Sequence, residues 1–172
     1  MITVYHGTDV VSAKEICKII DVTACAKHTD FGRGFYVTED FEQAKKWAYR
    51  KSRVRGRKPA VVTAYFDVDK AASLIEAFQD DLRWGRFIIN NRNGMGYIHQ
   101  VPFKDNNLDA RYPITYGRIS DIDVLSIAAK LKESGQMLMS LDGILNTAFP
   151  MQYAFHNNEV AEYLVGRRYR NL

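Results

Sequence analysis

The chain has 172 residues, a formal net charge of +4 and only two cysteines. This length fits one domain, residues 1–172, which can bury a core without disulfide or metal staples. The sequence lacks a run of about 18 apolar residues, which argues against a membrane-spanning helix, and its first residues do not resemble a signal peptide. We therefore expect a cytoplasmic protein with no membrane partner.

Positive charge is concentrated in two segments of the chain. Lysines and arginines are dense between Arg50 and Lys58, and arginines recur at the end, at Arg167, Arg168 and Arg170. Such clusters can bind phosphates or nucleic acid. A solvated helix end and a solvated tail would give the same pattern, so both interpretations stay open.

Hydrophobic patterns and capping residues predict short strands separated by helices. Asp40, Asp123 and Asn157 are expected to cap helices, and a Ser12–Glu15 capping box to start another. The expected strands are 2–6, 35–37, 60–68, 114–116 and 151–155, and the expected helices are 12–20, 40–56, 80–91, 120–131, 141–147 and 157–164, with an irregular excursion over 93–111. This irregular alternation indicates the α+β class rather than a doubly wound parallel sheet.

The first candidate binding feature is the segment Tyr5-His6-Gly7-Thr8, at the end of the first expected strand. Because Gly7 has no Cβ, a ligand could approach its backbone, whose N–H and C=O could pair with a carboxamide. His6 offers a polar ring and Thr8 a hydroxyl. A histidine that is only a hydrogen-bonded structural residue is the alternative.

The second candidate feature is Tyr36, on a strand entered through Gly32 and Gly34. Two glycines before an aromatic favour close approach of something flat, while a buried core tyrosine is the alternative. Trp47, on the following helix, either presents a second aromatic face to the same ligand or belongs to the buried face of an amphipathic helix. Together these features suit a flat, amide-bearing ligand such as nicotinamide. No recognisable metal-ligand set accompanies them.

These segments resemble the ADP-ribosyltransferase superfamily. Tyr5-His6-Gly7-Thr8 is similar to the His-Gly-Thr/Ser strand of its poly(ADP-ribose) polymerase and diphtheria-toxin branch, and residues 32–38 are similar to its Gly-x-Gly-x-Tyr strand. Nearly the whole chain resembles an uncharacterised family of small bacterial proteins of this branch, through segments 30–38, 42–48, 87–92 and 152–156. The resemblance implies an ADP-ribosyltransferase-like split β-sandwich of short strands with surrounding helices, and NAD as co-substrate.

The resemblance also implies roles for particular residues. His6 would bind the adenosine ribose while the Gly7 backbone holds the nicotinamide amide. Tyr36 would stack on the nicotinamide ring, with Trp47 as a second stacking aromatic. The third position of the superfamily, usually glutamate, corresponds here to Gln152.

Gln152 departs from the superfamily in charge. A glutamate can bind the ribose 2′-hydroxyl and stabilise a cation-like ribosyl transition state, whereas a glutamine keeps the hydrogen bond and loses the charge. This favours single transfer over polymer elongation and leaves reduced or lost activity as an alternative. Glu39 and Glu159 are candidates for a substitute acid, or else solvated residues at helix termini.

We therefore expect an NAD-dependent mono-ADP-ribosyltransferase with a protein or nucleic-acid acceptor. Analogy with small members of the superfamily adds a bacterial toxin–antitoxin or phage-defence role, with a cognate antitoxin as partner. Two alternatives remain open. One is a catalytically inert module that binds NAD or ADP-ribose, and the other is a nucleic-acid-binding domain that uses the two basic clusters.

Overall fold

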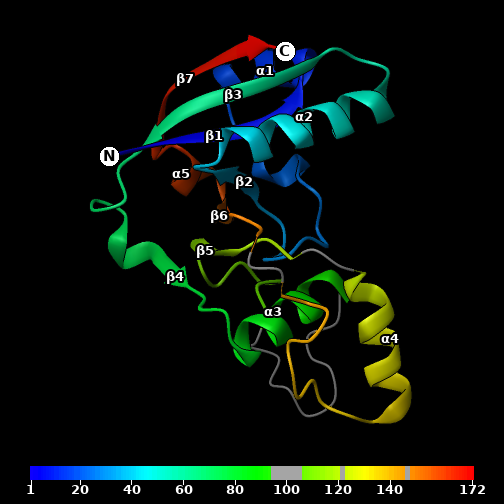
Figure 1. Ribbon diagram of the computed structural model, residues 1–172. Helices are drawn as coiled ribbons and strands as arrows, with labels where there is room; N and C mark the ends of the chain where they lie inside the picture. The colour runs from blue at the N-terminus through cyan, green and yellow to red at the C-terminus, as the bar shows by residue number, and fades with distance from the viewer. Residues whose placement is uncertain (94–105, 121–122, 146–147) are drawn as a thin grey trace.

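The computed structural model describes residues 1–93, 106–120, 123–145 and 148–172. Within these ranges it confirms the α+β class, with five α-helices and one open seven-stranded sheet (Figure 1). The strands are β1 Ile2–Asp9, β2 Phe35–Thr38, β3 Pro59–Phe66, β4 Ile75–Ala77, β5 Ile114–Arg118, β6 Met151–Phe155 and β7 Leu164–Asn171. The helices are α1 Val10–Lys18, α2 Phe41–Arg55, α3 Leu82–Asn93, α4 Val124–Ser134 and α5 Asn158–Ala161, with 3-10 turns at Val22–Ala24 and Ala72–Leu74.

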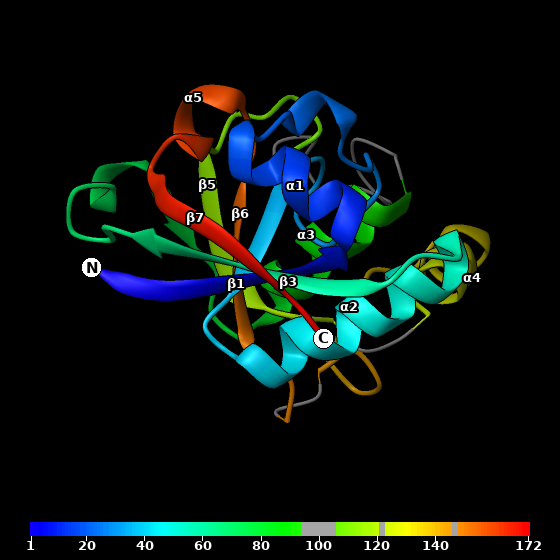
Figure 2. The same cartoon turned by 90° about the horizontal axis from the view of Figure 1, so that it is seen from above.

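The strand order is β4-β5-β6-β2-β1-β3-β7, and the sheet changes direction between β2 and β1. β1 pairs with β3 along its whole length, but its register with β2 contains the single pair Tyr5 and Thr38. In Figure 2, β1 and β3 run roughly horizontally, while β5 and β6 run roughly vertically. The strands of the expected split sandwich thus remain one hydrogen-bonded sheet whose two parts cross at a narrow junction.

Helices α1 and α2 cover the two faces of the part of the sheet that is formed by the neighbouring strands β1 and β3. Successive residues of β3 face opposite ways, so Val62 packs in the apolar cluster beneath α1 and Val61 in the cluster beneath α2. A second large core lies in the other part of the molecule, where Phe31 and Trp84 are buried between the sheet, α3 and α4. Among the described residues, none of the helices combines the length and apolar character needed to span a bilayer.

Most helix starts are set by local caps. Asp40 accepts a hydrogen bond from the Gln43 N–H, and Asn157 accepts one from the Val160 N–H, as the sequence predicts. The expectation of a start at Ser12 for the first helix is wrong, because Asp9 caps it and accepts from the Val11 and Ser12 N–H groups at 3.0 Å. The helix therefore begins at Val10 and ends at Lys18, before the expected Ile20.

The last expected helix is too long. It ends at Ala161, and Leu164 begins β7, which pairs with β3 at the edge of the sheet. The basic C-terminal cluster is therefore an edge strand and not a solvated tail. Arg168 lies over the ring of Tyr65, and Arg170 over the ring of Phe41, which gives these cations apolar partners.

Two further expectations differ from the structure or lie partly outside it. The helix expected over 141–147 is a turn at 142–144, and residues 146–147 lie outside the described residues. Within the excursion expected over 93–111, Asn93 ends α3, residues 94–105 lie outside the described residues, and 106–111 are irregular. The sequence did not indicate β4, a strand of three residues.

Candidate functional site

A cavity of about 490 Å³ lies at the junction of the two parts of the sheet. Its lining comes from β1, β2, β6, α2, the end of α3 and the loops that precede β2 and follow β5. Of the residues predicted from the sequence, those that line it are His6, Gly7, Tyr36, Trp47 and Gln152. The structure therefore brings together side chains from three neighbouring strands and one helix.

Thr8 and Gly34 do not line this cavity. Thr8 is buried on β1, on the face of the strand opposite to Gly7. Gly34 packs against His156, and a Cβ at position 34 would make a tight contact of 3.0 Å with His156 Nδ1. Both residues support the strands that carry the site and do not form its surface.

His6 is fixed by the strand that carries Tyr36. Its Nδ1 lies 2.6 Å from the Tyr36 carbonyl, and its ring stacks on Phe35 with centroids 4.4 Å apart. Since a carbonyl only accepts, Nδ1 carries the proton and Nε2 has the free lone pair. Burial, followed by the nearby Lys51 ammonium, lowers the pKa of His6 to about 3, so the ring is neutral at physiological pH.

The close packing of α2 on β1 requires a glycine at position 7. A Cβ on Gly7 would lie 1.8 Å from the Ala44 carbonyl oxygen, so no other residue allows the helix to pack this closely. The Val10 N–H donates to the Lys58 carbonyl at 3.0 Å, next to the end of the β1–β3 ladder. By the alternation of an antiparallel pair, Gly7 directs its own N–H and C=O away from β3, toward the side on which β1 and β2 separate.

Tyr36 presents its ring to the cavity while its hydroxyl is used elsewhere. The hydroxyl donates to the Gly32 carbonyl at 2.7 Å, accepts from the Phe31 N–H at 2.8 Å and contacts the Thr29 hydroxyl at 2.9 Å. Burial raises the pKa of Tyr36 far above its usual value. The hydroxyl therefore holds the loop before β2, and the half-buried ring is the part that can contact a ligand.

Helix α2 contributes an aromatic ring and two cations to the cavity. Trp47 is half-buried with the Arg50 guanidinium 5.1 Å from its ring centroid, and Lys51 follows one helical turn later. The Lys51 ammonium lies 3.4 Å from His6 Nε2 and can donate to it. Burial, followed by Arg55, lowers the pKa of Lys51 to about 8. This side of the cavity suits an anionic group such as a diphosphate.

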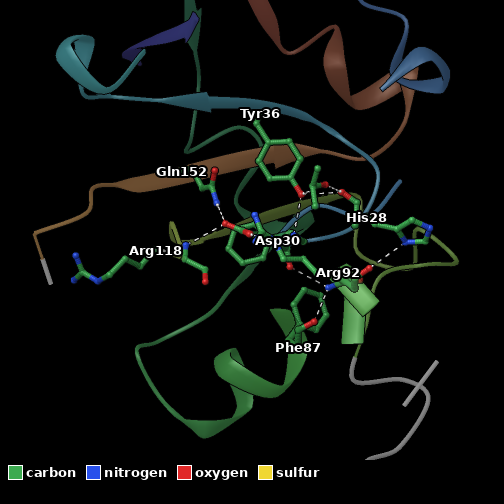
Figure 3. A network of polar contacts seen from close by, with 12 residues as sticks. His28, Asp30, Tyr36, Phe87, Arg92, Arg118 and Gln152 are labelled. Atoms are coloured by element: carbon green, nitrogen blue, oxygen red, sulfur yellow. Dashed lines mark hydrogen bonds and ion pairs between the residues drawn. The ribbon is translucent and has the colours of Figure 1, made fainter. Parts of the chain in front are cut away.

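Gln152 lies at the other side, hydrogen-bonded to a buried acid. Its Nε2 donates to Asp30 Oδ2 at 3.0 Å, and the Ser120 N–H donates to the same oxygen at 3.1 Å. Asp30 Oδ1 lies 2.8 Å from Arg92 Nε (Figure 3). Burial raises the pKa of Asp30, and the Arg92 charge opposes that shift. Of the acids considered from the sequence, Glu39 and Glu159 are exposed and outside the cavity lining, whereas Asp30 is inside it.

Asp30, Lys51 and Arg92 are cavity residues that the sequence interpretation missed. Lys51 was counted within a basic helix end, although its spacing of four from Trp47 places it on the same helix face. Asp30 and Arg92 lie in segments that carry the family resemblance, but their pairing requires the folded chain.

Part of the basic cluster at the end of α2 has a structural partner. Arg55 and Arg57 lie 2.8 Å and 3.3 Å from the buried carboxylate of Asp9. Burial acts against ionisation of this carboxyl, but hydrogen bonds from Ser12 and Arg55 hold its pKa below the usual range. These two arginines stabilise the start of α1, and their side chains remain 49% and 45% exposed.

In the described ranges, His, Cys, Asp and Glu residues form no group of three or more that could hold a metal ion. Neither a curated protein nor a solved structure matches the chain. A family model described as a protein of unknown function, DUF3990, matches residues 2–165. The chain therefore belongs to the DUF3990 family.

Proposed function

We propose that this protein is an NAD-dependent mono-ADP-ribosyltransferase. The observation that carries the proposal is the meeting of His6, Tyr36 and Gln152, from β1, β2 and β6, around one cavity. The ADP-ribosyltransferase superfamily, which these segments resemble, places its three site residues on three strands. A cavity of about 490 Å³ is also within the usual range for cofactor-sized ligands.

The two sides of the cavity suit the two ends of NAD. Nicotinamide would lie on the Tyr36 ring, with its carboxamide paired to the Gly7 backbone groups that point away from β3. Lys51 and Arg50 would neutralise the diphosphate. Trp47 adds a flat apolar surface on the same side. Neutral His6 could accept a ribose hydroxyl at Nε2 once Lys51 turns toward phosphate.

The reaction breaks the bond between ribose C1′ and the nicotinamide nitrogen. The bonding electron pair leaves with nicotinamide and neutralises its positive charge, and C1′ gains cation character. An acceptor oxygen or nitrogen then forms the new bond to C1′ and loses its proton to solvent. A hydrogen bond from the ribose 2′-hydroxyl to Gln152 Oε1 would strengthen as this positive charge develops.

The acceptor is a cytoplasmic protein or nucleic acid in this proposal. A toxin–antitoxin or phage-defence role, with an antitoxin that covers the cavity, rests on analogy with small members of the superfamily. A nucleic-acid-binding module is less well supported, because several cations of the two clusters already contact Asp9, Tyr65 or Phe41.

The test is incubation of the purified protein with labelled NAD and host lysate, with measurement of free nicotinamide and of label in protein and nucleic acid. We expect nicotinamide release and label in one fraction, both lost in Tyr36→Ala. The rival supported by the uncharged Gln152 is an inert NAD-binding module. Calorimetric binding of NAD without release of nicotinamide would support that module and exclude the enzyme.

A further inference from the structure

Position 152 carries a glutamine where the resembling superfamily usually has glutamate, but the side chain of Gln152 is hydrogen-bonded to a carboxylate, that of Asp30. Asp30 lies in the loop before β2, is 6% exposed and lines the cavity. Figure 3 shows it between Gln152 on one side and Arg92 on the other. Two N–H groups, from Ser120 and Gln152, donate to Asp30 Oδ2, and the Arg92 guanidinium forms an ion pair with Oδ1 at 2.8 Å. Two donors on one oxygen and a cation beside the other favour the ionised carboxylate and oppose the rise in pKa that burial causes.

A carboxylate fixes which end of the Gln152 amide faces the ligand. Ionised Asp30 accepts hydrogen bonds and cannot donate them, so Gln152 must turn its NH₂ group toward it. The other end of the amide is Oε1, which makes no hydrogen bond to the described residues. Since Gln152 lines the cavity, this oxygen is the group available to a ligand hydroxyl.

The same contact supplies negative charge. A hydrogen bond from the amide N–H to a carboxylate draws electron density toward the amide oxygen, because bonded groups polarise one another. Burial raises the pKa of Asp30, and the Arg92 guanidinium, 2.8 Å from Oδ1, opposes that shift and favours the ionised form. A neutral glutamine backed by an anion thus replaces part of what a glutamate would provide.

We propose that Asp30 is a positioning residue of this site, which orients Gln152 so that Oε1 accepts the ribose 2′-hydroxyl and which places a negative charge behind that amide. This inference rests on the proposed function and deepens it. It also explains how transfer could proceed without a glutamate at position 152.

The kinetic test compares Asp30→Asn with wild type in nicotinamide release. Asparagine can donate, so Gln152 no longer has one forced orientation, and the charge is gone. We expect kcat to fall about tenfold while KM for NAD changes less than about threefold, because the lost contact matters most in the transition state. The double variant Asp30→Asn with Gln152→Glu moves the charge to position 152 and should recover most of the lost kcat.

The matched control is Asp9→Asn, which also removes a buried, ion-paired carboxylate but lies outside the cavity lining. It should lower the melting temperature and leave kcat unchanged. If Asp30→Asn only lowered the melting temperature in the same way, Asp30 would be structural and the inference would be overturned.

A second variant tests the contact without reference to activity. Gln152→Glu alone places two carboxyl groups within about 3 Å, which raises their pKa values because like charges repel. Stability should then be highest at low pH, where the pair shares a proton, and should fall as pH rises through the raised pKa. Arg92 from α3 and Tyr36 from β2 interact electrostatically with Asp30, and Asp123 at the start of α4 lines the same cavity and interacts with Arg92.

We expect the melting temperature of Gln152→Glu to fall between pH 5 and 9 more steeply than that of wild type, and the added Asp30→Asn to abolish the difference. Equal slopes would overturn the contact on which the inference depends. An inactive wild type would overturn the proposed function, whereas an active wild type with unaffected Asp30→Asn would overturn only this inference.

Discussion

The two sides of the cavity differ in how far their polar groups are already paired. On the α2 side, Lys51 and Arg50 contact only a histidine nitrogen and an aromatic ring in the described structure, and Gly7 turns its backbone toward the opening. On the β6 side, Asp30 and the Tyr36 hydroxyl each have three contacts. The α2 side can therefore adapt to bind an anionic ligand, while the β6 side holds a fixed arrangement suited to chemistry.

The largest expected effect is a loss of stability from a substitution at Gly7, where β1 packs closely against α2. Gly7→Ala would place a Cβ 1.8 Å from the Ala44 carbonyl oxygen, and neither backbone segment can move without separating α2 from β1. We expect a loss of about 3 kcal/mol in the free energy of unfolding, measured by urea titration. Gly135→Ala, with open space around it but a φ of 67°, is the control and should cost only about 1 kcal/mol. Similar losses for both would show that the contact with α2 is unimportant.

Two substitutions of Tyr36 separate the ring from the hydroxyl. Tyr36→Ala removes the ring surface and should weaken NAD binding by about 2 kcal/mol in calorimetry. Tyr36→Phe keeps the ring but leaves the Phe31 N–H without its acceptor, while the Gly32 carbonyl still accepts from the Thr29 hydroxyl. It should lower stability by about 1–2 kcal/mol and leave the NAD affinity nearly unchanged. A large loss of NAD affinity in Tyr36→Phe would mean that the hydroxyl contacts the ligand directly.

This difference between the two sides also explains what could be predicted from sequence. Local signals were sufficient where a residue acts on its own neighbours, as in the caps at Asp40 and Asn157. They were insufficient for β7, whose alternating arginines look like a solvated tail until Tyr65 and Phe41 supply ring partners from elsewhere in the fold.

The residues of the candidate site show the same contrast between local signals and contacts made only in the folded chain. His6, Tyr36 and Trp47 were found from short motifs that each contain their own signal. Asp30 was missed because its partner Gln152 is 122 residues away, so no local spacing indicates the pair. Without that contact, the glutamine appeared to be a simple loss of charge.

A substitution of Lys51 tests whether the α2 side of the cavity binds the phosphates of the ligand. Lys51→Met removes the cation at nearly constant length and should weaken NAD binding by about 1 kcal/mol, since one phosphate contact is lost. Because the pKa of Lys51 is about 8, the wild-type affinity should decline as pH rises from 7 to 9 and the lysine loses its charge. The variant should lack that decline. Lys46→Met, on the exposed side of the same helix, is the control and should bind as wild type does. An unchanged decline in Lys51→Met would assign it to another group.

The smallest expected effect concerns the pH dependence of stability near His6. Its pKa is about 3 in the folded protein and near 6.5 when unfolded, so the unfolded chain binds more protons between these values. Stability therefore falls as pH drops below 6.5, and a change from pH 7 to pH 6 should cost about 0.7 kcal/mol through this residue. His6→Asn should reduce the acid-side slope in urea unfolding by that amount, although His156, whose pKa is lowered to about 4, leaves a remainder of the same sign. An acid-side slope that is unchanged in His6→Asn would mean that folding does not lower the pKa of His6, so that Nε2 would take up a proton near pH 6.5 and lose its lone pair as an acceptor below that pH.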